Sequence, residues 1–193
     1  MEINWQAQLG QDRFVVDALG AKRNGTYVDI GAGDPIDISN TYVLEREFGW
    51  KGLLCEKDPV LRADIIAKRP GNYVVEDART SHWPSLFEAY AVNGWIDYLS
   101  LDLEPPELTL EVLRAIPFDQ FRFRIATVEH DLYRQGHRRM VEMASIMYAN
   151  GYQYVGTAGL KVDGGSCDIE DWWIHEDSGI TFDPSTLKDA HES

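Results

Sequence analysis

Short apolar runs alternate along the chain with longer segments whose apolar residues recur every three or four positions. The runs are rich in β-branched and aromatic residues, which is typical of strands, whereas the longer segments have the spacing of amphipathic helices. Seven strands are expected, at residues 25–30, 52–56, 72–76, 95–102, 123–130, 152–158 and 169–176. The alternation predicts an α/β fold with a doubly wound, mostly parallel seven-stranded sheet.

Capping residues, prolines and glycines mark where the intervening helices begin and end. Helices are expected from Ser39 to Gly49, from Asp58 to Pro70, over residues 80–94, around residues 107–115, and before Gly151. In the last of these, one face carries the stripe Met140, Met143, Ala144, Met147 and Tyr148. Such a stripe at helical spacing indicates a face that packs on the core.

The length of 193 residues is typical of one domain, and no linker or internal repeat divides the chain. A single domain over residues 1–193 is expected, with a mobile tail at 183–193. No stretch approaches the roughly 18 apolar residues of a membrane span, and the amino terminus lacks the pattern of a signal peptide. These features predict a cytoplasmic protein with no membrane partner.

The net negative charge of the chain bears on which partners it can bind. The formal net charge is −14 and the pI is near 4.6, so a polyphosphate backbone would be repelled unless a local basic patch compensated. The basic clusters, FRFRI and the group around Arg138, are short. Nucleic acid is therefore disfavoured as a substrate, and a small molecule is expected instead.

The residues that end the strands carry the candidate chemistry, because open α/β sheets bind ligands beyond the carboxyl ends of their strands. These ends hold Asp29 to Gly33, Glu56 and Lys57, Asp77 and Ala78, Asp102 to Glu104, and Glu129 and His130. Each of the first five strands thus ends at or beside an acid.

A glycine turn after the first strand and an acid after the second indicate a cofactor that contains a nucleoside. The turn lets backbone approach a ligand, and Glu56, 25 residues after Gly31, can accept both ribose hydroxyls. Pro35 and the lack of a third glycine at Ile36 do not suit a pyrophosphate. A zwitterionic amino-acid end suits the turn better, since Asp29 or Asp34 can accept hydrogen bonds from an ammonium group.

The string VDIGAGDP resembles motif I of class I S-adenosylmethionine (SAM)-dependent methyltransferases. Together with QAQLGQDRFV, the continuation to GLLCEKDP, DYLSLDLE and TVEH, it is similar to the FkbM-like branch of that superfamily. The resemblance covers residues 6–130 and implies a Rossmann-like class I methyltransferase fold with SAM as cofactor. Pro35 and Pro105 depart from the family pattern and stiffen loops at the mouth of the expected site.

The resemblance also implies roles for single residues. Its glycine turn would line the methionine part of SAM, Glu56 would hold the ribose with Lys57 beside it, and Asp77 would meet the adenine. The expected cofactor-binding residues are Gln11, Asp29, Gly31, Ala32, Gly33, Asn40, Thr41, Glu56, Lys57, Asp77, Ala78 and Asp102.

Two acids and an imidazole at neighbouring strand ends are candidate ligands for a metal. Asp102, Glu129 and His130 would converge there, and such a set could hold Mg²⁺ or another divalent metal that activates a substrate oxygen. The alternative is that Asp102 only contacts SAM and that Glu129 pairs with Arg122 or Arg124.

The sequence predicts methyl transfer from SAM to a hydroxyl of a sugar or related small metabolite. Asp102, Glu104 and His130 are the expected catalytic residues, with His130 as the candidate base because imidazole accepts a proton near neutral pH. Two alternatives stay open. One is a nucleotide-cofactor oxidoreductase, which Pro35 disfavours, and the other is a SAM-binding module without turnover, which Pro105 leaves open.

Overall fold

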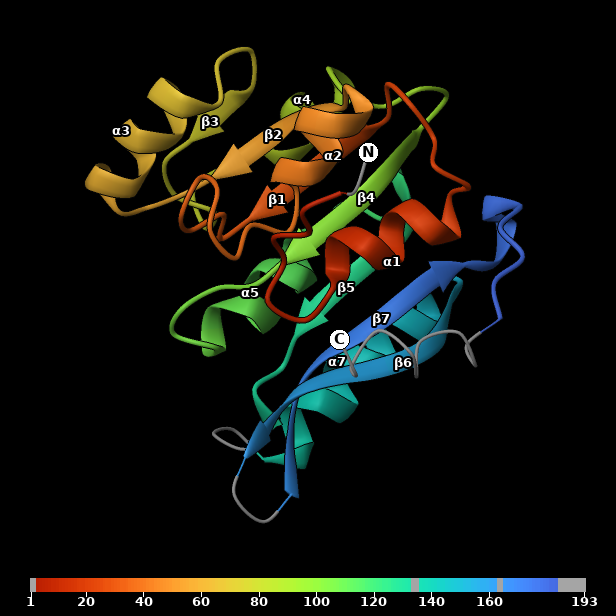
Figure 1. Ribbon diagram of the computed structural model, residues 1–193. Helices are drawn as coiled ribbons and strands as arrows, with labels where there is room; N and C mark the ends of the chain where they lie inside the picture. The colour runs from red at the N-terminus through yellow and green to blue at the C-terminus, as the bar shows by residue number, and fades with distance from the viewer. Residues whose placement is uncertain (1–2, 133–135, 163–164, 184–193) are drawn as a thin grey trace.

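A computed structural model describes residues 3–132, 136–162 and 165–183. The predicted mobile tail at 183–193 lies outside the described residues, apart from Asp183, and the single-domain interpretation stays a prediction. In the described part, helices cover both faces of one sheet (Figure 1). None of the described helices is long and apolar enough to cross a membrane.

Seven strands form the sheet, as the alternating pattern predicts. They are β1 (Thr26–Ile30), β2 (Lys51–Cys55), β3 (Tyr73–Val75), β4 (Trp95–Leu101), β5 (Arg122–Glu129), β6 (Tyr152–Val162) and β7 (Gly165–His175). Their order is β3-β2-β1-β4-β5-β7-β6, and only β7 runs antiparallel to its neighbours. The chain therefore has a doubly wound sheet whose order changes direction between β1 and β4, where ligands bind in such folds.

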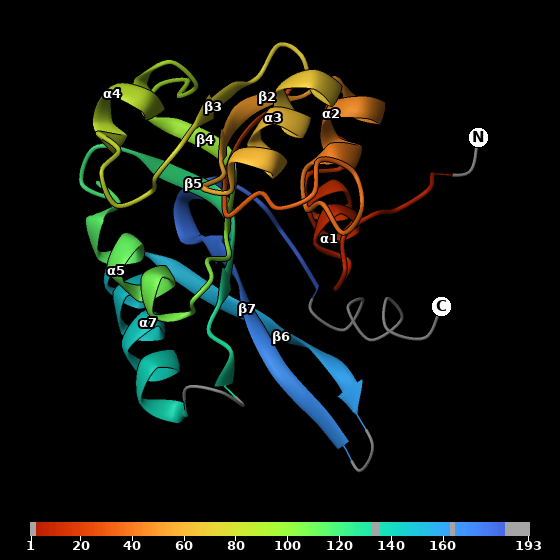
Figure 2. The same ribbon diagram turned by 90° about the vertical axis from the view of Figure 1, so that its left-hand side faces the viewer.

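The described helices lie on both faces of the sheet (Figure 2). One face carries α1 (Gln11–Ala18), α2 (Tyr42–Phe48) and α3 (Pro59–Lys68), and the other carries α4 (Trp83–Glu88), α5 (Glu107–Ala115) and α7 (His137–Ala149). Each layer closes its own apolar core against the central strands. Burial on both faces explains why β4 is buried from Ile96 to Leu101 and has no polar alternation.

The observed helices differ from the expected ones at three points. The helix α1 was not predicted: it buries Phe14 and Val15 although it has only eight residues. The helix expected over residues 80–94 ends at Glu88, because the following chain turns and Val92 pairs with Trp95 in an antiparallel bridge. Of the methionine stripe on α7, Met143 and Met147 are buried as predicted, whereas Tyr148 is 58% exposed.

Candidate functional site

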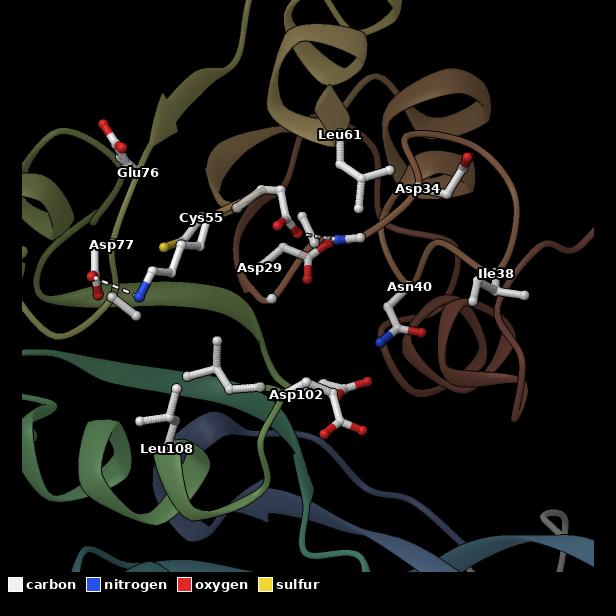
Figure 3. Close-up of a pocket in the computed structure, with 18 of the residues that line it drawn as sticks. Asp29, Asp34, Ile38, Asn40, Cys55, Leu61, Glu76, Asp77, Asp102 and Leu108 are labelled. Carbon is white, nitrogen blue, oxygen red and sulfur yellow. Dashed lines mark hydrogen bonds and ion pairs between the residues drawn. The ribbon is translucent and has the colours of Figure 1, made fainter. Parts of the chain in front are cut away.

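A cavity of about 350 Å³ opens at the carboxyl ends of the strands on either side of the change in strand order (Figure 3). All the predicted cofactor-binding residues except Thr41 line it, namely Gln11, Asp29, Gly31, Ala32, Gly33, Asn40, Glu56, Lys57, Asp77, Ala78 and Asp102. Thr41 is fully buried behind the cavity. The sequence therefore located the cavity, although which ligand these residues bind stays a prediction.

The two glycines of the turn have different roles. A Cβ at Gly31 would lie 1.6 Å from the backbone oxygen of Asp102, so this position needs glycine for the close approach of β1 to the end of β4. A Cβ at Gly33 would meet no atom within 4 Å, and φ there is +60°. Gly33 therefore leaves its backbone open to the cavity, whereas Gly31 serves the packing of the protein itself.

Glu56 is held against the glycine turn by backbone amides. Its Oε2 accepts a hydrogen bond from the amide of Gly33 at 2.9 Å, and its Oε1 accepts one from the amide of Asp58 at 2.7 Å. The second bond forms where the chain turns into α3. The side chain of Asp58 caps that helix. A carboxylate fixed in this way has its remaining lone pairs available at the cavity wall.

Asp77 is held by two cations at the far end of the cavity. The guanidinium of Arg79 donates to Asp77 at 3.2 Å, and the ammonium of Lys57 lies 3.5 Å from the same oxygen (Figure 3). The bonds from Arg79 lower the pKa of Asp77 to about 2. Asp77 therefore remains a carboxylate at any physiological pH.

Asp29 is the next-to-last residue of β1 and is only 2% exposed. Its Oδ2 accepts a hydrogen bond from the Thr41 hydroxyl at 2.6 Å, and nearby the Asn40 amide donates to the Ser100 hydroxyl at 3.0 Å. Burial raises the pKa of Asp29, while the bond from Thr41 and the charge of Arg69 oppose that rise. The carboxyl thus has one oxygen anchored inside the protein while the residue lines the cavity.

Three carboxyl side chains form a row across β4, β5 and β7, which we call the acidic row: Asp102, Glu129 and Glu170. Leu101 pairs with Val128 in the β4–β5 register, so the next residues, Asp102 and Glu129, are neighbours. Glu129 lies opposite Glu170 in the antiparallel β5–β7 register. Only Asp102 of the row lines the cavity.

The three carboxyls of the acidic row all have raised pKa values. The carboxyls of Asp102 and Glu129 lie on neighbouring strands, and burial raises the pKa of both. Burial likewise raises the pKa of Glu170 to about 8, although this carboxyl accepts hydrogen bonds from the indole of Trp172 and the amide of Gln11. Sequence reasoning missed Glu170; the available signal was the pair of acids Glu170 and Asp171 inside the otherwise apolar run IEDWWI of the last strand.

The predicted metal set is not brought together by the structure. His130 is 1% exposed; its Nδ1 accepts a hydrogen bond from the Leu132 amide at 3.2 Å, and its Nε2 lies 3.4 Å from a carboxylate oxygen of Asp171. The ring therefore faces β7 while Asp102 and Glu129 face each other. Among the residues that the structure describes, no group of three or more acids, histidines or cysteines is placed to hold a metal ion.

The three predicted catalytic residues have different positions. Asp102 and Glu104 line the cavity, whereas His130 is not among the residues that line it. The buried His130 ring lacks a lone pair directed at a ligand, because the amide of Leu132 occupies Nδ1. The geometry thus favours the carboxyl groups over the imidazole as candidate proton acceptors.

Comparison with solved structures places the fold among methyltransferases. A candidate rRNA-methylase from Clostridium thermocellum matches with a TM-score of 0.59 and 13% identity over 89% of this chain and 97% of that one. Precorrin-6y C5,15-methyltransferase from Geobacter metallireducens matches with a TM-score of 0.55 and 11% identity, over 84% of each chain. Aeropyrum pernix fibrillarin, solved with natively bound SAM, has a TM-score of 0.50 and 14% identity over 86% of this chain and 76% of that one.

The structural similarity establishes the class I methyltransferase fold, and sequence identities this low establish nothing finer. No protein-family model matches the chain, and no curated protein matches its sequence. The resemblance to the FkbM-like branch therefore stays a prediction. The matched proteins also differ in what they act on, since their descriptions include ribosomal RNA and a precorrin.

Proposed function

We propose that the protein is a SAM-dependent methyltransferase that binds SAM in the cavity at the carboxyl ends of β1, β2 and β4. One observation supports this proposal most strongly. The turn at Gly33 exposes its backbone to a space that the carboxylates of Asp29, Glu56 and Asp77 surround at separate points. That distribution fits a nucleoside joined through a positively charged sulfur to a zwitterionic amino-acid end better than it fits a pyrophosphate, which the acids would repel.

Each acid suits one part of the cofactor. Glu56 accepts from the ribose hydroxyls, and Asp77, ionised beside Ala78, accepts from the exocyclic amine of adenine. Asp29 accepts from the ammonium group, with Gln11 and Asn40 near the carboxylate. SAM supplies a methyl group on a positively charged sulfur, which an acceptor displaces in one in-line step.

The charges around the cavity favour a small acceptor without anionic groups. The lining of the cavity includes the acids Asp29, Asp34, Glu56, Glu76, Asp77, Asp102 and Glu104. The cations of the lining, Lys57 and Arg79, both pair with Asp77. A hydroxyl of a sugar-like metabolite satisfies this environment, whereas a phosphate backbone would meet repulsion without a counter-charge.

We assign the uptake of the acceptor proton to Asp102, with Glu104 beside it at the mouth. Asp102 is the carboxyl of the acidic row that lines the cavity, and burial raises its pKa, which suits a group that takes up a proton. As the hydroxyl oxygen bonds to the methyl carbon, its proton passes to Asp102 and the sulfur keeps the electron pair of the broken bond.

Calorimetry with SAM, S-adenosylhomocysteine and NAD tests the cofactor, and mass spectrometry of S-adenosylhomocysteine formation with a panel of sugars, small amines and RNA tests the acceptor. We expect micromolar or tighter SAM binding and turnover with a hydroxylated small molecule. NAD binding without SAM binding would support the oxidoreductase. SAM binding without turnover on any member of the panel would favour a binding module, and turnover on RNA alone would overturn the proposed acceptor.

A further inference from the structure

A buried arginine lies behind the wall of the cavity. Arg69 follows α3 directly, and its side chain is 0% exposed. Four of its contacts are hydrogen bonds to side chains: Glu45 Oε2 at 2.8 Å, Ser39 Oγ at 3.2 Å, Tyr27 Oη at 2.9 Å and Thr41 Oγ1 at 2.9 Å. A guanidinium has only donors, so it determines the hydrogen-bonding direction of every group that it touches.

The contact with Thr41 determines where the threonine hydroxyl points. Because Arg69 donates to Thr41 Oγ1, the single hydrogen of that hydroxyl is free to be donated elsewhere, and it is donated to Asp29 Oδ2 at 2.6 Å. A chain of two hydrogen bonds therefore runs from a buried cation to a carboxylate that lines the cavity. This chain explains why Thr41 belongs with the site although it does not line the cavity.

Strand geometry makes the arrangement specific. Tyr27 and Asp29 are two residues apart on β1 and so point to the same face of the sheet, where Arg69 contacts the tyrosine directly and the aspartate through Thr41. A buried cation is costly unless it is paired, and here Glu45 carries the compensating charge at 2.8 Å. Of the groups that Arg69 contacts, Thr41 is the one whose hydroxyl continues to Asp29 at the cavity.

We propose that Arg69 is a positioning residue: acting through Thr41, it holds the Asp29 carboxylate in the orientation that receives the ammonium group of the cofactor. The inference rests on the proposed function. It predicts that the loss of Arg69 or of the Thr41 hydroxyl weakens recognition of the amino-acid end of the ligand and leaves recognition of the nucleoside intact.

Two ligands separate this role from a merely structural one. S-adenosylhomocysteine carries the amino-acid end, and 5′-methylthioadenosine has the same nucleoside and thioether without it. Calorimetry at neutral pH should show that Thr41→Val binds S-adenosylhomocysteine roughly tenfold more weakly, as expected for a lost hydrogen bond to a charged group, with unchanged affinity for methylthioadenosine. Arg69→Met should produce at least the same selective loss.

A control variant and an unfolding measurement complete the test. Lys68→Met removes the same charge from the end of α3 at an exposed side chain outside the chain of hydrogen bonds, and it should bind both ligands as the wild type does. Thermal unfolding of each variant without ligand reports its folding, and if Arg69→Met does not fold, Thr41→Val decides the question.

Three outcomes would overturn the inference. Equal weakening of both ligands in Thr41→Val would reduce Arg69 and Thr41 to structural roles, and unchanged affinity for S-adenosylhomocysteine would remove them from the site; in either case the proposed function stands. If the wild type binds neither ligand, the proposed function fails and the inference fails with it.

Discussion

Acids on the two sides of the cavity are stabilised in opposite ways. On the side of β1, β2 and β3, Asp29, Glu56 and Asp77 each accept hydrogen bonds from a hydroxyl, backbone amides or a guanidinium, and we call them the anchored acids. On the side of β4, β5 and β7, the acidic row consists of carboxyls placed against other carboxyls. The pKa values differ most between Asp77, whose pKa Arg79 lowers to about 2, and Glu170, whose pKa burial raises to about 8. Burial also raises the pKa of Asp29, although the hydrogen bond from Thr41 and the charge of Arg69 oppose that rise.

This difference suits the anchored acids to ligand binding and the acidic row to proton transfer. An acid that hydrogen bonds hold in one orientation is suited to bind a ligand, because it needs no rearrangement when the ligand arrives. A carboxyl with a raised pKa is suited to take up and release protons near neutral pH. Four sets of substitutions test this division.

The largest effect is expected at the only member of the acidic row that lines the cavity. Asp102→Asn should lower turnover by roughly 10²–10⁴-fold because it removes the proton acceptor, while affinity for S-adenosylhomocysteine changes far less. Product formation by mass spectrometry and binding by calorimetry measure the two effects. His130→Ala, outside the cavity, serves as the comparison; a larger loss of turnover in that variant than in Asp102→Asn would reverse the assignment of the base.

Substitutions in the glycine turn test the contact between Gly31, after β1, and the backbone of Asp102, after β4. Gly31→Ala should lower the free energy of unfolding by more than about 3 kcal/mol, because its Cβ would overlap the backbone oxygen of Asp102. Gly33→Ala should cost only about 1–2 kcal/mol, the strain of an L residue at positive φ. Urea unfolding compares the two variants, and equal losses would contradict the different roles assigned to these glycines.

The acidic row should also make stability depend on pH. With a pKa of about 8 when folded and an ordinary value of 4.5, Glu170 holds its proton in the folded state while the unfolded chain has lost it. Stability should therefore fall as the pH rises from about 5 to 8, by at most about 1.4 kcal/mol per pH unit. Glu170→Gln should flatten this slope in urea unfolding, and Asp77→Asn should not, because Asp77 titrates near pH 2. A slope that is identical in wild type and Glu170→Gln would remove Glu170 as its source.

The smallest of the four effects is expected among the anchored acids. Glu56→Ala should fold and bind SAM roughly tenfold more weakly, since it loses charge-assisted hydrogen bonds to the ribose and releases the amide of Gly33. Calorimetry measures the change, with Glu47→Ala on the exposed side of α2 as the control. Unchanged affinity in Glu56→Ala would exclude Glu56 from the cofactor site.

Local signals were sufficient to predict the sheet and the cavity. The seven strands, the acids at their ends and the turn from Gly31 to Gly33 are encoded by contiguous residues, and parallel strands bring their carboxyl ends to one edge of the sheet. Glu56 and Asp77 could be placed there because each follows its strand directly. Helix α1 was missed because its short apolar stretch gains its stability from packing on α2 and β7, which lie far from it in the sequence.

The α/β fold and the set of residues along one edge of its sheet could therefore be predicted from the order of the residues. The pairing of those residues depends on how the chain packs: Arg69 lies behind Asp29, Glu170 beside Glu129, His130 toward Asp171, and Gly31 against the backbone of Asp102. The physical reason is that strand patterns arise from neighbouring residues, whereas hydrogen bonds and pKa values depend on groups that strand order and register bring together from distant parts of the chain.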